Sequence, residues 1–366
     1  MGEAKRRHAG TDRREQVSLA TLAAHLSLSQ AAISRVLNGV PAAAAIPSTT
    51  QERIFAAAKL FNYRPNVLAR SLRRGHSMTI GVLVPEISEG YATLVLAGLE
   101  QGLLMAGYAF FLCSHHHDME VVATSQTMLS ERAVDGIVAI DTTLVHIGLM
   151  PTVTVSCPDQ GSTTTDIVLD HQRGATLAME HLHALGHSRI AVIKGQQLSS
   201  DTEPRWRAIA AAADLLGIPL NPDTTTQLEE DAPTHEPGYL ATRRLLDHGV
   251  RFTALFAFND VSAIGAIRAL REAGLRVPQD VSVVGFDDVQ SAAFQNPALT
   301  TVRQPLHAMG LRAAQEIVHL VTNGERHQPV VLEPELIVRE STAQVCSDEA
   351  QHVRTTSGTT RQIQRC

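Results

Sequence analysis

Two short amphipathic helices are predicted between residues 17 and 38, where apolar side chains recur with helical spacing. The first has apolar positions at i, i+3, i+4 and i+7, which are Leu19, Leu22, Ala23 and Leu26. Its N-cap is predicted at Ser18, whose hydroxyl can accept a hydrogen bond from a free amide of the first turn. Ser29 has the same role in the second helix, which turns Ile33, Val36 and Leu37 inward.

The outer face of the second helix carries side chains that are suited to reading DNA. A glutamine can hydrogen-bond a base edge, an alanine can touch a thymine methyl, and an arginine can reach guanine or phosphate. Two short helices joined by a tight turn are typical of a helix-turn-helix, whose second helix enters the major groove. We therefore expect six residues to contact double-stranded DNA, namely Ser29, Gln30, Ala31, Ser34, Arg35 and Asn38.

This part of the chain resembles the LacI/GalR family of bacterial transcriptional regulators. The resemblance is carried by SxAxISRVLNG and by the block TxxERIxxAAxxxxYRPNxxARSLRxG that follows it. In that family the segment after YxPN is a hinge helix that orders on operator DNA. The resemblance implies that Leu72 is inserted at a central base step, with Ala69 beside it in the minor groove and Arg70 next to them. A helix that merely connects two domains, with Leu72 in a small core, is the alternative.

Two local features depart from the family pattern. The pair Leu26-Ser27 stands where the family usually has Ala-Gly, which predicts a strained turn. The loop over residues 40–45 is predicted to be longer than usual. Either feature can shift the third helix or the operator preference.

From Thr79 onward, short apolar runs alternate with helical patterns. The predicted strands are Ile80–Val84, Ala109–Cys113, Gly136–Ile140, Thr152–Val155, Ile190–Ile193, Ala254–Phe258 and Val281–Val284. This alternation predicts an α/β region of parallel sheets flanked by helices, in which ligands bind beyond the carboxyl ends of the strands. The family resemblance continues to about Thr342, and it implies a two-lobed effector domain similar to periplasmic binding proteins.

The expected organisation is therefore an all-α DNA-binding head followed by a two-lobed body. The segments are a disordered basic tail over 1–16, the helix-turn-helix domain over 17–64, the hinge helix and linker over 65–77, the effector domain over 78–342 and a disordered tail over 343–366. By analogy with the family, one lobe holds about 78–168 and 304–333, and the other holds about 169–303 and 334–342.

The resemblance also implies which side chains bind the effector. The second lobe would offer Arg207, Asn259 and Asp287, and the first would offer Tyr91, whose ring can stack on a ligand. Weaker candidates at strand ends are Glu86 and Ser156. Because arginine donates in a fork and a carboxylate accepts from two hydroxyls, the expected effector is a small polar molecule, a sugar or a sugar derivative.

Charge is distributed unevenly along the chain. Residues 1–75 hold 12 Lys and Arg against 4 Asp and Glu, whereas the other residues hold 19 against 33, for a net charge of −6. A basic head favours phosphate contact and an acidic body does not. The four cysteines show no CxxC spacing, and neither a long apolar run nor a secretory h-region is present. We expect a cytoplasmic, nucleoid-associated bacterial protein without membrane partners.

Two patterns could indicate chemistry of other kinds. The pair Asp287-Asp288 could act as a general acid and base, but it lies within a binding motif, so we expect no enzyme activity. The run His115-His116-His117-Asp118 could suggest zinc, but consecutive histidines point in different directions, so a solvated loop is favoured. We expect no metal and no cofactor.

The function predicted from the sequence is a transcriptional regulator, a repressor that binds a pseudo-palindromic operator as a homodimer. Residues 343–366 lack an apolar heptad, which favours a dimer over a tetramer. A small polar effector would control DNA affinity by shifting the two lobes. The alternatives are a solute-binding protein without a regulatory role and an α/β hydrolase that acts on a sugar or nucleoside.

Overall fold

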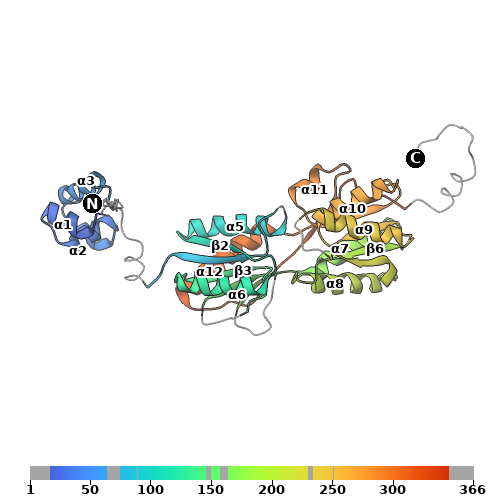
Figure 1. Cartoon of the computed structure of the whole chain (residues 1–366), viewed down its shortest axis with the longest axis horizontal. Helices are drawn as coiled ribbons and strands as arrows, with labels where there is room; N and C mark the ends of the chain where they lie inside the picture. Colours follow the sequence, from blue (N-terminus) through green and yellow to red (C-terminus); the bar gives the residue numbers. More distant parts are fainter. Residues whose placement is uncertain are drawn as a thin grey trace, which may run out of the picture. The chain divides into compact units, whose positions relative to one another are not determined.

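The computed structural model describes residues 17–63, 75–88, 90–145, 150–156, 164–229, 234–249 and 251–345. The chain divides into two compact units between Ser77 and Met78 (Figure 1). None of the helices in these described ranges has the length and apolarity needed to cross a membrane.

The first unit is a small helical bundle. Its elements are α1 (Leu19–Leu26), α2 (Gln30–Leu37), the 3-10 helix η1 (Pro41–Ala45) and α3 (Ser48–Leu60). Both predicted N-caps are confirmed, since Ser18 accepts from the Thr21 amide and Ser29 from the Ala32 amide. Leu22, Ile33 and Ile54 are fully buried and join the three helices in one core.

The departures from the family pattern take definite forms in this unit. Ser27 ends α1 in the left-handed region at φ 54°, where a side chain is strained and glycine is not. Residues 41–45, within the loop predicted to be long, form η1, which begins at a proline.

The second unit contains two parallel sheets, each in its own lobe (Figure 1). The sheet of lobe 1 has the order β11-β5-β4-β3-β1-β2, and its strands are β1 (Thr79–Val84), β2 (Ala109–Ser114), β3 (Gly136–Ile140), β4 (Thr152–Val155), β5 (Thr165–Leu169) and β11 (Val330–Leu332). The sheet of lobe 2 has the order β12-β10-β9-β8-β6-β7, and its strands are β6 (Ile190–Lys194), β7 (Thr225–Gln227), β8 (Ala254–Ala257), β9 (Ser282–Asp287), β10 (Thr300–Arg303) and β12 (Glu335–Ile337). Only the β10–β12 pairing in these sheets is antiparallel.

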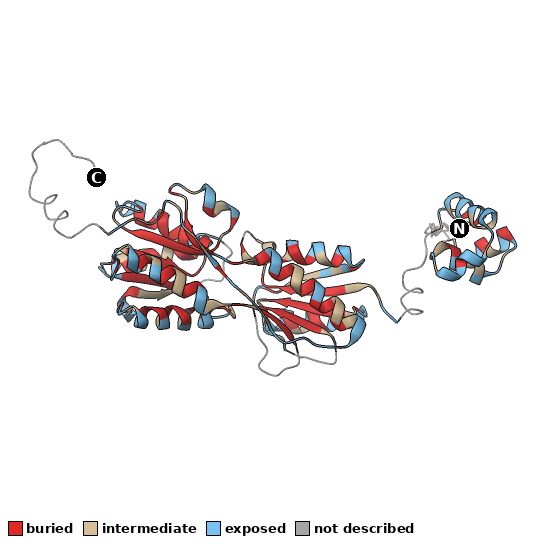
Figure 2. Cartoon of the chain, turned by 180° about the vertical axis from the view of Figure 1, so that it is seen from behind, coloured by how far each residue is buried: buried red, intermediate tan, exposed pale blue. Residues whose placement is uncertain are grey.

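Helices cover both faces of each sheet. Lobe 1 has α5 (Tyr91–Met105), α6 (Met119–Glu131) and α12 (Leu306–Asn323); lobe 2 has α7 (His171–Ala184), α8 (Thr202–Leu215), α9 (Glu236–Asp247), α10 (Asp260–Glu272), α11 (Gln290–Phe294) and the 3-10 helix η2 (Pro222–Thr224). The central strands are buried along nearly their whole length (Figure 2). Because both faces of these strands are covered, apolar runs such as GIVAI form strands without alternating polar positions.

The chain crosses between the lobes three times. The crossings follow β5, β10 and β11, so that α12 and β11 return to lobe 1 and β12 ends in lobe 2. In lobe 1, α12 packs against α5 with close contact between their backbones. A Cβ on Gly98 would overlap the carbonyl of His307, and one on Gly310 would overlap the carbonyl of Val95.

Beyond β12 the described chain continues to Val345 and makes hydrogen bonds to lobe 2. The Val345 amide donates to the Leu185 carbonyl at 2.9 Å, and the Ala343 carbonyl accepts from His187 at 3.0 Å. Residues 346–366, like residues 1–16, lie outside the described ranges.

Candidate functional site

Helix α2 exposes part of the predicted DNA-reading set. Gln30, Ala31 and Arg35 are exposed on one face, next to the exposed N-cap Ser29. Ser34 was expected on that face but is only 8% exposed, which corrects its place. Its small side chain is covered by the end of the helix. There the side-chain amide of Asn38 donates to the Ser34 carbonyl at 2.7 Å and to the Ser34 hydroxyl at 3.1 Å.

Three further residues were expected in the minor groove. Ala69, Arg70 and Leu72 fall in 64–74, outside the described residues.

In the second unit, a pocket lies between the lobes, beyond the carboxyl ends of β1, β3, β8 and β9. We call its two sides the lobe 1 wall (Glu86, Tyr91, Asp141) and the lobe 2 wall (Asp201, Arg205, Asn259, Asp287). Its free volume is about 90 Å³, less than the ~150 Å³ apolar cavity that accepts benzene in another protein.

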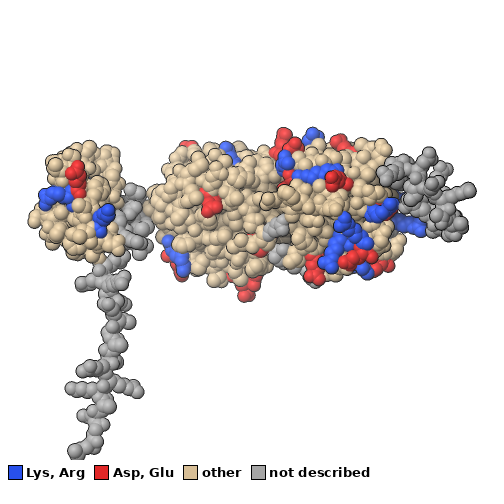
Figure 3. All heavy atoms as spheres, turned by 90° about the horizontal axis from the view of Figure 1, so that it is seen from above, with Lys and Arg blue, Asp and Glu red and all other residues tan. Residues whose placement is uncertain are grey.

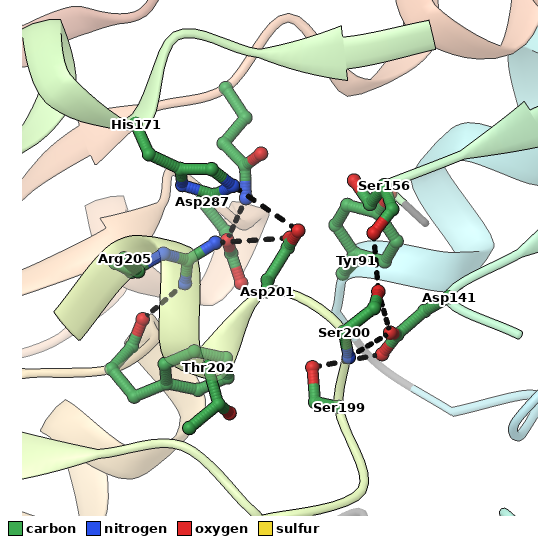
Figure 4. Close-up of polar contacts among 12 residues, drawn as sticks. Tyr91, Asp141, Ser156, His171, Ser199, Ser200, Asp201, Thr202, Arg205 and Asp287 are labelled. Atoms are coloured by element: carbon green, nitrogen blue, oxygen red, sulfur yellow. Dashed lines mark hydrogen bonds and ion pairs between the residues drawn. The ribbon is translucent and has the colours of Figure 1, made fainter. Parts of the chain in front are cut away.

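Arg205 is the central cation of the lobe 2 wall (Figure 4). It is 2% exposed, and its guanidinium lies over the rings of Phe286 at 3.8 Å and Phe258 at 4.4 Å. It donates to the Phe258 carbonyl at 2.6 Å and to Asp201 at 3.3 Å. The aromatic rings fix the plane of the guanidinium, so its remaining donors have defined directions.

Arg207, the predicted effector contact, does not reach this pocket. Its side chain is 77% exposed and pairs with Glu203 at 2.8 Å on the surface of α8. Two residues along a helix correspond to a rotation of about 200°, so Arg205 and Arg207 face opposite ways. The helix places Arg205 in the position expected of Arg207.

Asp201 is held by two basic side chains. Besides Arg205, His171 lies 3.2 Å from its carboxylate. Burial alone would raise the pKa of Asp201, but His171 and Arg205 outweigh burial and keep the pKa below its usual value.

Asn259 and Asp287 both line the pocket as expected. Asn259 also caps α10, since its side chain accepts from the Ser262 amide at 2.9 Å. Asp287 accepts from Gln304 at 2.6 Å, and its burial raises its pKa to about 7 even though Arg205 and Gln304 oppose the rise. Its neighbour Asp288 pairs with Arg303 at 2.7 Å and Arg339 at 2.6 Å, so it belongs to an ion-pair network of lobe 2 rather than to an acid–base pair.

On the lobe 1 wall, Tyr91 donates to the Ser156 hydroxyl at 2.6 Å. Glu86 also lines the pocket, whereas the buried Ser156 acts as the partner of Tyr91.

Asp141 follows β3 and joins the lobes (Figure 4). It accepts from the Ser200 amide at 2.8 Å, the Ser200 hydroxyl at 2.5 Å and the Ser199 hydroxyl at 3.1 Å, all in the loop between β6 and α8 of lobe 2. Burial and the charge of Asp201 raise the pKa of Asp141.

The histidine run is in part the solvated loop that was expected, since His116 and Asp118 are exposed, whereas His115 is buried. His115 is 2% exposed and lies 2.8 Å from the Thr142 hydroxyl, and its burial lowers its pKa to about 4. His117 lines the pocket, and Asp118 caps α6. Within the described ranges, no group of three or more His, Cys, Asp and Glu side chains is arranged to hold a metal ion.

Three pocket residues that make these contacts were missed from the sequence, namely Asp141, Asp201 and Arg205. Gln304, the buried donor to Asp287, was missed as well. A signal existed for Asp141, which directly follows a predicted buried strand, as ligand-binding residues of parallel sheets do. Gln304 had no such signal, because it lies in a crossing between lobes.

Comparison with known proteins agrees with this architecture. Residues 179–342 match the model of the periplasmic binding protein-like domain family. The chain is 32% identical over 307 residues to the HTH-type transcriptional repressor PurR of Haemophilus influenzae. The alignment covers 81% of this chain and 90% of the relative. The chain belongs to the LacI family of transcriptional regulators. PurR of Yersinia pestis is 31% identical over 332 residues, covering 88% of this chain and 96% of that protein.

Solved structures of LacI family members are similar over most of the chain. The Lac repressor dimer bound to operator and the anti-inducer ONPF superposes with a TM-score of 0.80 at 25% identity, over 90% of this chain and all of that one. The regulator CelR in complex with cellobiose has a TM-score of 0.67 at 28% identity, over 89% of this chain and 99% of that one. A LacI family regulator of Enterococcus faecium with bound ribose has a TM-score of 0.65 at 29% identity, over 73% of this chain and all of that one. These relatives are repressors or regulators of transcription.

Proposed function

We propose that this LacI family protein is a repressor that binds a pseudo-palindromic operator as a homodimer and responds to a small polar effector. The observation that carries the proposal is the combination, in one chain, of a capped recognition helix and a pocket lined by polar side chains of two lobes. In this proposal α2 reads the major groove through Gln30, Ala31 and Arg35. Residues 65–77 form the hinge, with Ala69, Arg70 and Leu72 at the minor groove.

The apolar surface of lobe 1 supports a homodimer. Leu104 and Met105 on α5 are 62% and 79% exposed, and Phe111 on the edge strand β2 is 46% exposed. In the face shown in Figure 3, charged side chains gather on lobe 2 and are sparse on lobe 1. Large apolar side chains exposed on one lobe are typical of a surface that another subunit covers.

The pocket supports an effector with several hydroxyl groups, a sugar or a sugar derivative. Arg205, Asn259 and Asp287 offer donors and acceptors within one concave surface, and the solved relatives bound to cellobiose and ribose are sugar complexes. Effector binding changes the spacing of the lobes, and operator affinity changes only if one arrangement binds the effector more tightly.

The direct test is footprinting of the purified full chain on its own promoter region, at a fixed salt concentration, with and without a panel of sugars. A protected palindrome whose affinity changes with one sugar supports the whole proposal. Protection that no sugar changes supports the DNA-binding half and contradicts the sugar half. No protection of any promoter DNA contradicts the repressor function.

The hinge assignment is tested by Leu72→Ala. We expect operator affinity to fall about tenfold, because a wedge between base steps contributes on the order of 1–2 kcal/mol through the bend that it stabilises. The matched control is Leu215→Ala on α8, which removes a leucine that is 81% exposed. Equal operator affinity of both variants, with unchanged thermal unfolding, would contradict the wedge.

A further inference from the structure

The pocket is unusually rich in carboxylates for the number of cations that it holds. Among the described residues that line it, the acids are Glu86, Asp141, Asp201 and Asp287, and the basic residues are Arg205 and His117. An anionic effector such as a sugar phosphate would meet repulsion from this surface, since like charges in a poorly solvated site disfavour each other strongly.

The one arginine is already engaged with the lobe 2 wall. Arg205 donates to Asp201 and to the Phe258 carbonyl, and its charge also acts on Asp287. His171 adds a second basic partner to Asp201. The guanidinium of Arg205 is therefore already engaged by Asp201 and the Phe258 carbonyl.

Asp141 has a different environment. The hydrogen bonds to its carboxylate come from Ser199 and Ser200, which are neutral donors. His117 acts on Asp141 electrostatically, and Asp201 repels it. A buried carboxylate held by hydroxyls and an amide is a place where an added cation gains free energy.

An aromatic ring lies among these carboxylates. Burial, followed by the charges of Asp201, Asp141 and Asp287, raises the pKa of the Tyr91 hydroxyl well above the usual value. Tyr91 lines the pocket at the start of α5. A tyrosine ring beside several carboxylates is a combination that binds ammonium groups, through the negative face of the ring and the charges around it.

We propose that the effector is a polyhydroxylated amine, such as an amino sugar, whose protonated amine lies beside Tyr91 and Asp141. Its hydroxyl groups face Asn259, Arg205 and Asp287 on the lobe 2 wall. This inference rests on the proposed function, because it names the ligand class of the same pocket.

The pocket's protonation supports the same ligand class. Burial raises the pKa of Asp287 to about 7 although Arg205 opposes the rise, and Asp287 also faces Asp201, Gln304 and Asp260. Asp141 has a raised pKa and faces Asp201, His117 and the serines of the β6–α8 loop. A bound ammonium stabilises the ionised forms of both, so amine affinity falls as the pH is lowered from 7 to 5, while the affinity of a neutral sugar changes less.

The test is calorimetric titration of the full chain at pH 7 in the absence of DNA. Glucosamine and galactosamine are each compared with the parent sugar, which lacks the amine, and with the N-acetyl derivative, which lacks its charge. We expect at least one amine to bind about tenfold tighter or more than both of its neutral counterparts, a difference of about 1.4 kcal/mol. Equal or tighter binding of the neutral sugars, or no binding of either amine at 10 mM (roughly −3 kcal/mol, the limit of weak binding), overturns the proposal.

A variant locates the amine within the pocket. Asp141→Asn keeps the shape of the side chain and removes its charge, and we expect it to reduce the amine preference to less than about threefold. The matched control is Asp214→Asn, an exposed acid on α8, which should keep the full preference. An undiminished preference in Asp141→Asn overturns the assignment of the amine to that wall.

Operator binding separates this inference from the proposed function. Footprinting that responds to a neutral sugar and not to an amine overturns the amine while the repressor function stands. Preferential amine binding by a protein that protects no DNA supports the amine and contradicts the repressor function.

Discussion

The two walls of the pocket hold their buried carboxylates by different means. On the lobe 2 wall, Asp201 has Arg205 at 3.3 Å and His171 at 3.2 Å, and these groups lower its pKa. On the lobe 1 wall, the hydrogen bonds described for Asp141 come from Ser199 and Ser200, and burial raises its pKa. The first carboxylate stabilises its own lobe, whereas the second depends on groups from the opposite lobe.

Asp201 therefore has a structural role, whereas the environment of Asp141 changes when the lobes move. Asp201 and Arg205 belong to one helix end and remain together whatever the lobes do. The partners of Asp141 come from lobe 2, so its solvation changes whenever the lobes separate. The lobe 1 wall is therefore where ligand and lobe movement are coupled most directly.

The largest effect on the lobe 2 wall is expected for Arg205→Ala. We expect the free energy of unfolding to fall by about 3–5 kcal/mol, because the substitution removes the arginine partner of the buried Asp201 and the packing of the guanidinium on two aromatic rings. Urea denaturation measures the change. Arg207→Ala is the matched control on the same helix, and its surface ion pair predicts a loss below about 0.5 kcal/mol. Similar losses in both variants would contradict the different roles of the two arginines.

The pH dependence of stability sharpens the comparison at Asp287. Its folded pKa of about 7 lies above the usual 3.8, so its contribution to stability is fully present below pH 4 and is lost as the pH rises to about 7. Relative to Asp287→Asn, the wild-type protein should lose up to about 4 kcal/mol between pH 4 and pH 7.5. Parallel stability curves for the two proteins over this window would show that Asp287 is ionised with an ordinary pKa.

The smallest effect is expected at Asp141. Asp141→Asn still accepts from the Ser200 amide, and the serine hydroxyls can turn to accept from the new amide group. We expect the free energy of unfolding to change by less than about 1 kcal/mol. Asp201→Asn is the comparison, with an expected loss of roughly 3 kcal/mol because Arg205 then lacks its charge partner. If the two substitutions cost the same, the two walls do not differ as described.

The parts of the fold that depend on local pattern could be predicted from the sequence. The caps at Ser18 and Ser29 and the apolar stripes of α1 and α2 involve neighbours along one short segment. The seven predicted strands are present, because buried parallel strands need continuous apolar runs. Five further strands, among them the three-residue β7, β11 and β12, are too short or too polar to show such a run.

The pocket could be predicted only in part, because its geometry depends on helix phase and on distant segments. The family motif predicts Arg207 in the pocket, but the helical phase of α8 turns Arg205 inward instead. Asp141 and Ser200 are 59 residues apart and in different lobes, so no local pattern joins them. Ser34 shows the same limit on a small scale, since the side chain of Asn38 covers it.

The three crossings between the lobes also govern how the protein is made. Lobe 1 includes Met309, Ala313 and Ile317 of α12 in its core, although its first strand begins at Thr79. A ribosome therefore releases most of lobe 2 before lobe 1 has the segment that completes it. During synthesis the apolar face of α5 stays uncovered until α12 is made, and a chaperone that shields that face would act in this interval.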